Sequence, residues 1–299
     1  MKKRDKKWLT LIAILLIVIG LSITITQQHN RPCDYPEIAA RGVLHVSVIH
    51  SPLSYNTNSD SIHGYDYELL QLLRSKSGLE IEITPEPHFS HCLQQLNKRT
   101  CDIVAHPIAI TSQSQAEYIH SLPTSLNKQV LIQRTDSTGS VAIRNQLDLR
   151  GCTLHIIQDS PTRLRIENLA HEIGDNIYIC EKHNYNVERL VEEVANGSID
   201  YAVCDEASVR IVATKYCNID YKTDISFTQF MAWTMRNEST ELCDSINSWL
   251  MAIEKTEQFR ELYTRYFGTK NYDKLQRINP QLYTPQRDSI MTSTEEVKL

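Results

Sequence analysis

The sequence predicts an α/β protein built from two similar units, and three observations support this fold class. Strand-like and helix-like runs alternate from residue 42 onward, which is typical of a largely parallel sheet. The polar stretch RTDSTGS at 134–140 interrupts this alternation, after which a second series begins. The chain has 299 residues, of which 41% are hydrophobic and 22% charged, so it is long enough for one large or two medium globular domains.

The first series is predicted to be βαβαβ, from β-branched runs, helical spacing of apolar residues and turn residues between them. Its elements are the strand VLHVSVI at 43–49, the helix YDYELLQLLRSKSG at 65–78, the strand LEIEIT at 79–84, the helix HCLQQLNKRT at 91–100 behind Ser90 as a cap, and the strand CDIVAH at 101–106. The first helix ends in Ser-Gly, a common stop signal.

The second series repeats this pattern, with Ser160 as an expected N-cap and Pro161 in the first turn of its first helix. Its elements are strands at 152–157, 176–181 and 200–204, and helices at 160–174, 186–197 and 206–216. After FTQFMAWTM at 227–235 the chain is predicted to be helical over 241–267. Residues 269–299 are expected to form a loosely ordered C-terminal extension.

The N-terminus predicts a membrane segment. Residues 1–7, MKKRDKK, carry five basic residues against one acidic residue, and residues 8–25 are uncharged and mostly apolar. Such a segment spans roughly 27 Å as a helix, about the thickness of the hydrocarbon core. A retained anchor is favoured over a cleaved signal peptide, because the run is long and no A-x-A-like cleavage site follows it. Residues 1–7 are then a cytoplasmic tail and the rest is exported.

Charge and motifs exclude several classes of function. The chain carries a net charge of −5, and because residues 1–7 contribute +4, the remainder carries −9. Nucleic acid is therefore a poor candidate partner. No G-x-G-x-x-G motif or P-loop occurs, which disfavours a nucleotide-binding enzyme. A small solute or another protein is the expected partner.

The chain contains eight cysteines, many for an exported domain, at positions 33, 92, 101, 152, 180, 204, 217 and 243. No C-x-x-C occurs and no common zinc spacing is matched, so a metal or other cofactor is not expected. Cys92 and Cys101 flank one short predicted helix and either pair or remain free. Cys204 lies in an apolar run and is expected to be a buried free thiol.

Six segments together resemble the family 3 extracellular solute-binding proteins. They are RGVLHVSVIHSPLSY, GYDYELLQLL, CDIVAHPIAIT, DLRGCTLHIIQDS, LVEEVANGSIDYAVCDEASV and FRELYTRYFG. The resemblance covers about residues 41–268. It implies a type II periplasmic-binding-protein fold, in which two lobes joined by two crossing strands close on a ligand. The crossings are expected near 129–134 and 228–235, with lobe 1 at 36–132 plus 230–268 and lobe 2 at 133–229.

The same resemblance places one ligand contact in the turn IAITSQSQAEYIHSLP after the third strand, with Ile108, Thr111 and Ser114 as the expected contacts. In amino-acid-binding members an Arg of this turn clamps the ligand α-carboxylate. Ser114 occupies that position here, so the clamp is expected to be missing.

Other candidate ligand contacts come from both predicted lobes. Asp205 matches the family's amine-binding Asp, with a plain helix N-cap as its alternative role. Ser160 and Thr162 match backbone and hydroxyl contacts at the start of the lobe 2 helix, with simple capping as the alternative. Three further residues are expected to face the cleft at strand ends or as an aromatic wall: His50, His106 and Tyr55.

The resemblance extends to the binding module of membrane-bound lytic murein transglycosylases, but catalysis is not expected. Only 31 residues follow Gly268, too few for a lysozyme-like domain, and there is no G-x-S-x-G motif.

The leading hypothesis is an inner-membrane-tethered periplasmic protein that binds a small polar, amino-acid-like or peptide-like ligand, with an ABC permease or another envelope protein as a further partner. The ligand's carboxylate is expected to be absent, masked as in a peptide, or held by protonated His50 or His106. The alternative is a non-catalytic regulatory or scaffold module that acts through protein contacts.

Overall fold

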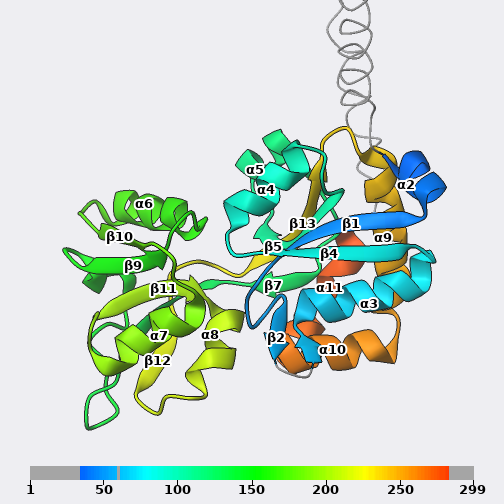
Figure 1. The fold of residues 1–299 in the computed structure, drawn as a ribbon. Coiled ribbons are helices and arrows are strands. Elements are labelled where there is room, and N and C mark those ends of the chain that lie inside the picture. The colour runs from blue at the N-terminus through cyan, green and yellow to red at the C-terminus, as the bar shows by residue number, and fades with distance from the viewer. Residues whose placement is uncertain (1–33, 59–60, 283–299) are drawn as a thin grey trace, which may run out of the picture.

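The computed structural model describes residues 34–58 and 61–282, which form two lobes joined by two chain crossings (Figure 1). The predicted membrane segment at 8–25 lies outside the described residues. Within the described part of the chain, every helix is too short or too polar to cross a bilayer.

The larger lobe is built on a sheet with the strand order β4-β1-β5-β13-β6, to which β7 is added by pairing with β13. The strands β1, β4 and β5 run parallel, and β13 runs antiparallel to β5, β6 and β7. Up to the first crossing its elements are α2 (Tyr35–Arg41), β1 (Val43–Ile49), β2 (Asn56–Asn58), β3 (Ser61–His63), α3 (Tyr65–Ser77), β4 (Glu80–Glu86), α4 (Phe89–Asn97), β5 (Ile103–Ala109), α5 (Ser112–Glu117), β6 (Tyr118–His120) and β7 (Ser125–Asn127).

The smaller lobe is built on a sheet with the order β10-β9-β11-β8-β12. Its elements are β8 (Gln129–Arg134), a 3-10 helix (Gln146–Leu149), β9 (Thr153–Ile157), α6 (Thr162–Ile173), β10 (Tyr178–Lys182), α7 (Val187–Asn196), β11 (Tyr201–Asp205), α8 (Glu206–Ala213) and β12 (Ile219–Asp224). Apolar side chains form a core on each face of this sheet, one beneath α7 and α8 and the other beneath α6.

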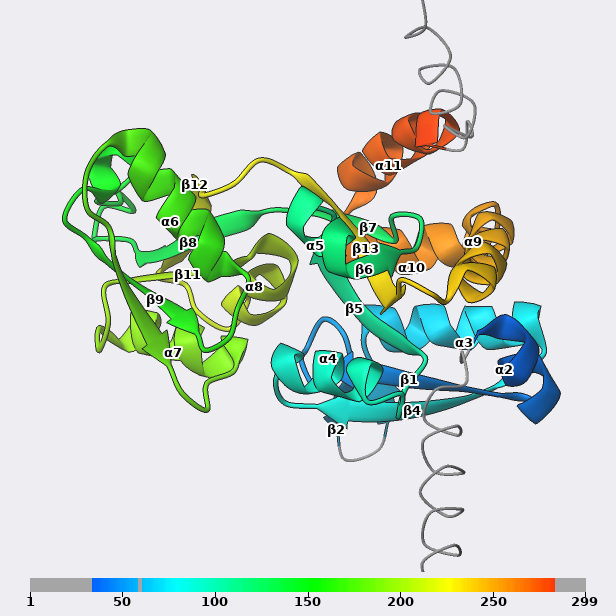
Figure 2. The same ribbon diagram turned by 90° about the horizontal axis from the view of Figure 1, so that it is seen from above.

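The chain passes between the lobes at two places. The first crossing is Lys128, between β7 and β8, and the second is residues 225–228, between β12 and β13 (Gln229–Arg236). Figure 2 shows both segments bridging the gap between the two sheets. Residues 129–132, which we expected in lobe 1, lie instead in the smaller lobe, because β8 pairs with both β11 and β12.

After β13 the chain returns to the larger lobe as α9 (Thr240–Glu254), α10 (Glu257–Phe267) and α11 (Thr269–Leu282). The predicted continuous helix over 241–267 is therefore two helices, and the Thr256 side chain caps the second by accepting a hydrogen bond from the Phe259 N–H at 3.3 Å. The prediction of a loosely ordered segment is wrong for residues 269–282. Leu275 is fully buried and Tyr272 packs on the Tyr263 ring, so apolar contacts stabilise this last helix.

Of the two alternatives left open for Cys92 and Cys101, the structure shows free thiols. Both residues are buried in a small apolar cluster with Leu96 and Val104, and both are free. The Cys92 thiol points to the Val48 carbonyl at 3.8 Å. Each of the seven described cysteines is a free thiol, including the buried Cys204.

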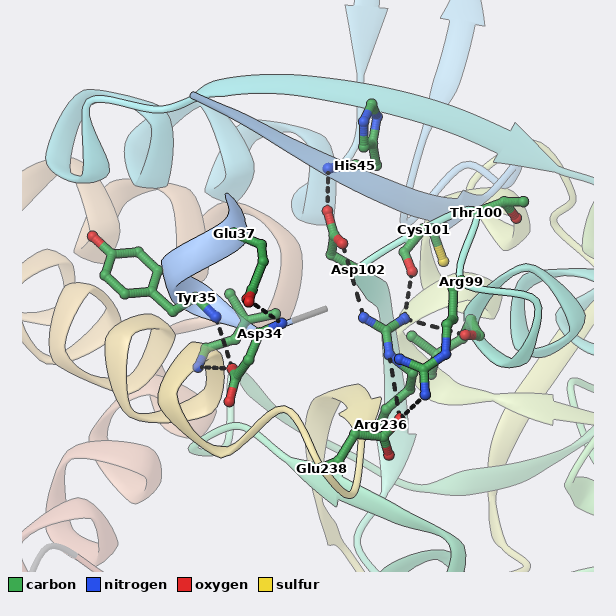
Figure 3. Close-up of polar contacts among 12 residues, drawn as sticks. Asp34, Tyr35, Glu37, His45, Arg99, Thr100, Cys101, Asp102, Arg236 and Glu238 are labelled. Carbon is green, nitrogen blue, oxygen red and sulfur yellow. Dashed lines mark hydrogen bonds and ion pairs between the residues drawn. The ribbon is translucent and has the colours of Figure 1, made fainter. Parts of the chain in front are cut away.

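A buried ionic network anchors the end of β13 that is farther from the crossing (Figure 3). Arg236 is 5% exposed and donates hydrogen bonds to the carbonyls of Leu96 at 3.1 Å and Cys101 at 2.7 Å. Its guanidinium also lies 3.8 Å from the carboxylate of the buried Asp102, which accepts from the His45 N–H at 2.9 Å. Because Asp102 directly precedes β5, the network joins β13 to the start of the central strand.

Candidate cleft between the two lobes

A cleft of about 400 Å³ lies between the lobes. The larger lobe lines it with α4, the end of β5, α5, β6, the end of β7 and β13, and the smaller lobe lines it with the start of β8, α6 and the end of β11. Lys128 of the first crossing completes the lining. A cavity of this volume falls within the range of about 300–1,000 Å³ that is usual for small-molecule sites.

The turn after β5 uses its hydroxyls to start a helix. Thr111 and Ser114 form a reciprocal capping box for α5, with N–H to hydroxyl distances of 3.0 and 3.1 Å. The Ser114 hydroxyl also lies 3.0 Å from Nε2 of His120, whose Nδ1 lies 3.2 Å from the Thr234 hydroxyl. Burial lowers the pKa of His120, so this group is neutral at pH 7. The position where we expected the family's arginine therefore holds a neutral hydrogen-bonded network on the cleft wall, and Ile108 lines the wall beside it.

Asp205 ends β11 and lines the cleft while also capping a helix. Its Oδ1 atom accepts hydrogen bonds from the Ser208 N–H of α8 and from the Asn127 side chain, both at 2.9 Å. Asn127 belongs to β7, directly before the first crossing. The carboxylate is thus held in place by groups from both lobes.

His106 lines the cleft from β5, and its ring packs against Phe89 with centroids 5.8 Å apart. Burial lowers the pKa of His106 to about 4, against an upward pull from Asp205. The ring is therefore neutral near pH 7, where the protonated form that we considered as a carboxylate partner is scarce.

Two predicted contacts lie elsewhere among the described residues. His50 follows β1 on the surface, with its Nε2 atom 3.5 Å from the Thr57 hydroxyl. Tyr55 is buried against Tyr67, with ring centroids 5.6 Å apart. Neither residue belongs to the cleft lining.

Ser160 and Thr162 flank Pro161, which does line the cleft at the start of α6. The Ser160 hydroxyl donates to Thr162 Oγ1, and the Thr162 hydroxyl donates to Gln129 Oε1, both at 2.8 Å. Ser160 is not the formal N-cap, although its hydroxyl accepts a 3.3 Å bond from the Thr162 N–H. The two hydroxyls therefore position Gln129, a cleft-lining residue.

Two cations in the cleft were missed from the sequence: Lys128 and Arg165. Lys128 Nζ lies 2.6 Å from Asp224 and 3.6 Å from Glu206. Burial alone would lower the pKa of Lys128, but the hydrogen bond to Asp224 and the attraction of Glu206 outweigh it and raise the pKa. Arg165 donates to the Ile225 carbonyl at 2.8 Å and to Glu172 at 2.7 Å.

The side of α6 that lines the cleft is one helix face of mixed residue types, so no pattern in the sequence marked it. Pro161, Leu164, Arg165 and Asn168 all line the cleft, and their spacing of i, i+3, i+4 and i+7 marks one face of a helix. Leu164 is 47% exposed and presents an apolar side chain to the cleft. Ser90 of α4 and Asp159 lie close in sequence to the cleft-lining Phe89 and Pro161. The Ser90 hydroxyl donates to Asp159 across the lobes at 3.4 Å.

The described residues contain no group of three or more His, Cys, Asp or Glu side chains placed to hold a metal ion.

Comparison with known proteins identifies the family and the fold. A family model described as bacterial extracellular solute-binding proteins, family 3, matches residues 44–269. Membrane-bound lytic murein transglycosylase F from Pseudomonas fluorescens (strain Pf0-1) is 22% identical over 276 residues, which cover 90% of this chain and 53% of that protein. The corresponding protein from Salmonella typhi is also 22% identical, with 99% of this chain and 62% of that protein covered. The chain thus spans roughly half to three-fifths of these relatives.

A solved structure with the same fold is the P235GK mutant of ArgBP from T. maritima, with a TM-score of 0.67, 22% identity, and coverage of 78% of this chain and 98% of that one.

Proposed function

Because the chain belongs to the family 3 bacterial extracellular solute-binding proteins, we propose that its two lobes form a non-catalytic module that binds a small polar, amino-acid-like or peptide-like ligand. The observation that carries this proposal is the cleft of about 400 Å³ lined from both lobes. Since two short crossings join the lobes, a hinge motion at Lys128 and residues 225–228 opens and closes the cleft.

The charges around the cleft favour a ligand with an amine or amide group. Asp205 offers a carboxylate to a cationic amine, and the Ser114 position offers neutral groups only. Lys128 and Arg165 are each already paired with acids of the smaller lobe. A free ligand carboxylate without its own counter-charge would lose several kcal/mol of hydration. We therefore propose that the ligand's carboxylate is absent or masked, as in a peptide.

The module acts in the periplasm, tethered to the inner membrane by residues 8–25, in transport or envelope sensing. The basic residues 1–7 followed by an apolar run support this placement. A permease or another envelope protein would then receive the signal of lobe closure.

A second candidate is a regulatory or scaffold module that acts through protein contacts without a ligand. Two observations favour it. The Ser114 position is filled by the protein's own hydrogen-bonded network, and the curated relatives are named as lytic murein transglycosylases.

Native mass spectrometry of the full-length chain, released from detergent, tests the leading proposal. We expect a co-purified small molecule that dissociates under gentle activation, and a thermal midpoint that rises when the identified molecule is added back. A chain that carries no small molecule, and whose thermal midpoint is unchanged by amino acids, amino-acid amides and cell-wall peptides, would support the scaffold candidate instead.

A further inference from the structure

The His106 side chain lines the cleft with both of its ring nitrogens unsatisfied by the described residues. Its Nδ1 atom is buried and has no hydrogen-bond partner, and none of the described residues bonds to Nε2 either. The ring is held in position by Phe89 on one side. Pro107 follows directly, so the strand has no backbone N–H donor at the next residue. Residue 106 therefore supplies the side-chain polar group at this point of the wall.

The protonation state of His106 follows from its burial. The ring is neutral near pH 7, because burial lowers its pKa to about 4. A neutral imidazole carries one N–H, and a buried N–H without an acceptor is rarer and costlier than a buried lone pair. The proton is therefore assigned to Nε2, the ring nitrogen that is not buried, and His106 offers the cleft a neutral donor.

The charged groups around this donor do not favour a free carboxylate. Lys128 is paired with Asp224, and Arg165 with Glu172. Two acids, Glu117 and Asp205, line the same cleft without a basic side chain bonded to them among the described residues. A neutral carbonyl can accept the His106 N–H without bringing a further negative charge into this environment.

We propose that His106 is a specificity-determining residue that donates a hydrogen bond from Nε2 to a neutral carbonyl of the ligand, so that the cleft selects amides and peptides over the corresponding free acids. The proposal rests on the proposed binding function and names the group that discriminates between ligand classes. Asp205 binds the amine of the same ligand, and His106 binds the adjacent carbonyl.

Calorimetric titration of the full-length chain in detergent at pH 6.5 tests this assignment with two matched pairs, leucine with leucinamide and arginine with argininamide. In the wild type we expect the amide of at least one pair to bind about tenfold more tightly than its acid. His106→Leu should weaken amide binding about five- to tenfold, as expected for the loss of one hydrogen bond, and should change acid binding less than about twofold. His106→Gln keeps an N–H donor and should restore most of the amide affinity. His63→Leu, at an exposed histidine of β3 outside the cleft lining, is the matched control.

Two results would overturn the role of His106 while leaving the binding function intact. In one, the free acids bind as tightly as their amides. In the other, His106→Leu weakens acid and amide by the same factor. If none of the four probes binds, the selectivity for amides is likewise refuted, and native mass spectrometry decides separately whether the module has another ligand.

Discussion

At the residue scale, one carboxylate oxygen of Asp205 serves two structural contacts. Its Oδ1 atom accepts from the first turn of α8 and from Asn127 beside the first crossing. The sequence left open whether Asp205 is a ligand contact or a helix cap, and the structure places the capping residue on the cleft wall. An alanine substitution would therefore disturb folding and binding together, so a substitution that keeps the cap is needed to separate them.

Asp205→Asn should weaken binding of leucinamide by about 1.5–3 kcal/mol, because a charge-assisted hydrogen bond to the amine becomes a neutral one. Stability should change by less than about 1 kcal/mol, because Asn is as good an N-cap as Asp. Calorimetry and urea unfolding of the same preparations measure the two effects. Asp200→Asn, at an exposed aspartate paired with Arg134, is the control. Unchanged amide affinity in Asp205→Asn would exclude Asp205 as the amine contact.

Burial shifts the pKa values of Asp66 and His106 in opposite directions. Burial raises the pKa of Asp66 to about 7, against the hydrogen bond that it accepts from Trp233 Nε1 at 3.0 Å. Unfolded Asp titrates near pH 4, so between about pH 4 and 7 the folded state binds more protons and the free energy of unfolding falls as pH rises. His106 is the reverse case. Its folded pKa of about 4 lies below the unfolded value near 6.5. Between these two pH values the contribution of His106 to the free energy of unfolding therefore rises with pH.

These opposing contributions should largely cancel in the wild type between about pH 4 and 6.5. Asp66→Asn removes the contribution to the free energy of unfolding that falls as pH rises, and it leaves the contribution of His106. Relative to wild type, its free energy of unfolding should therefore gain up to about 1.4 kcal/mol per pH unit across this window. Urea titrations at pH 4.5, 5.5, 6.5 and 7.5 measure the trend, with exposed Asp244→Asn as the control. Parallel pH profiles for Asp66→Asn and wild type would show that Asp66 is ionised in the folded state.

At the scale of elements, β13 connects the second crossing to the buried network at Arg236. The strand pairs with β5, β6 and β7, and its last residue is bonded to the loop before β5. This arrangement links the second crossing through β13 to the loop before β5, on the far edge of the larger lobe.

Asp102→Asn should destabilise the chain by about 3–5 kcal/mol, because it removes a buried carboxylate that is paired with both Arg236 and Arg41. Glu257→Gln is the matched control. It removes an exposed partner of Arg260, at 3.3 Å, and should cost less than about 1 kcal/mol. Chemical unfolding of both variants compares these costs, and equal costs would contradict the assigned importance of burial.

Elements specified by local sequence were predictable, whereas those that depend on distant contacts were not. Residues 43–49 form β1 as predicted, and the helices that stop at Gly78 and Gly197 do so with left-handed glycines at φ 71° and 86°. By contrast, α11 depends on Leu275 reaching the core of the larger lobe, which no local pattern reveals. The site divides in the same way. Asp205 and Ser114, which the resemblance named, line the cleft, and their contact with a ligand stays a prediction. Arg165 lines the cleft only through the packing direction of α6.

At the scale of the whole molecule, the lobes touch at the mouth of the cleft as well as at the crossings. The Ser90 hydroxyl reaches Asp159 at 3.4 Å, and Asp159 adopts a left-handed backbone with φ 57°. Apolar side chains from both lobes, including Phe89 and Leu164, line the cleft. At this edge of the cleft the two lobes are therefore in contact, and apolar side chains of both lobes lie beside the contact.

Ser90→Ala should raise the dissociation rate of leucinamide about two- to fivefold, because one exposed hydrogen bond between the two lobes is lost. The association rate should stay within about twofold, since the ligand enters the cleft while the two lobes are apart. Stopped-flow measurements give both rates, and Ser75→Ala, at an exposed serine of α3, is the control. A change confined to the association rate would contradict a role for this contact in retaining ligand.

Lys128 has a mechanical consequence for the hinge. It forms the first crossing, and its ammonium group bonds to Asp224, the residue where β12 ends and the second crossing starts. This ion pair links the two crossings, so we expect both crossings to move together when the lobes open or close. The Asp224 side chain is 50% exposed, and ions in solution weaken such a pair. The stiffness of the joint should consequently depend on ionic strength, with the lobes moving more freely in concentrated salt than in dilute buffer.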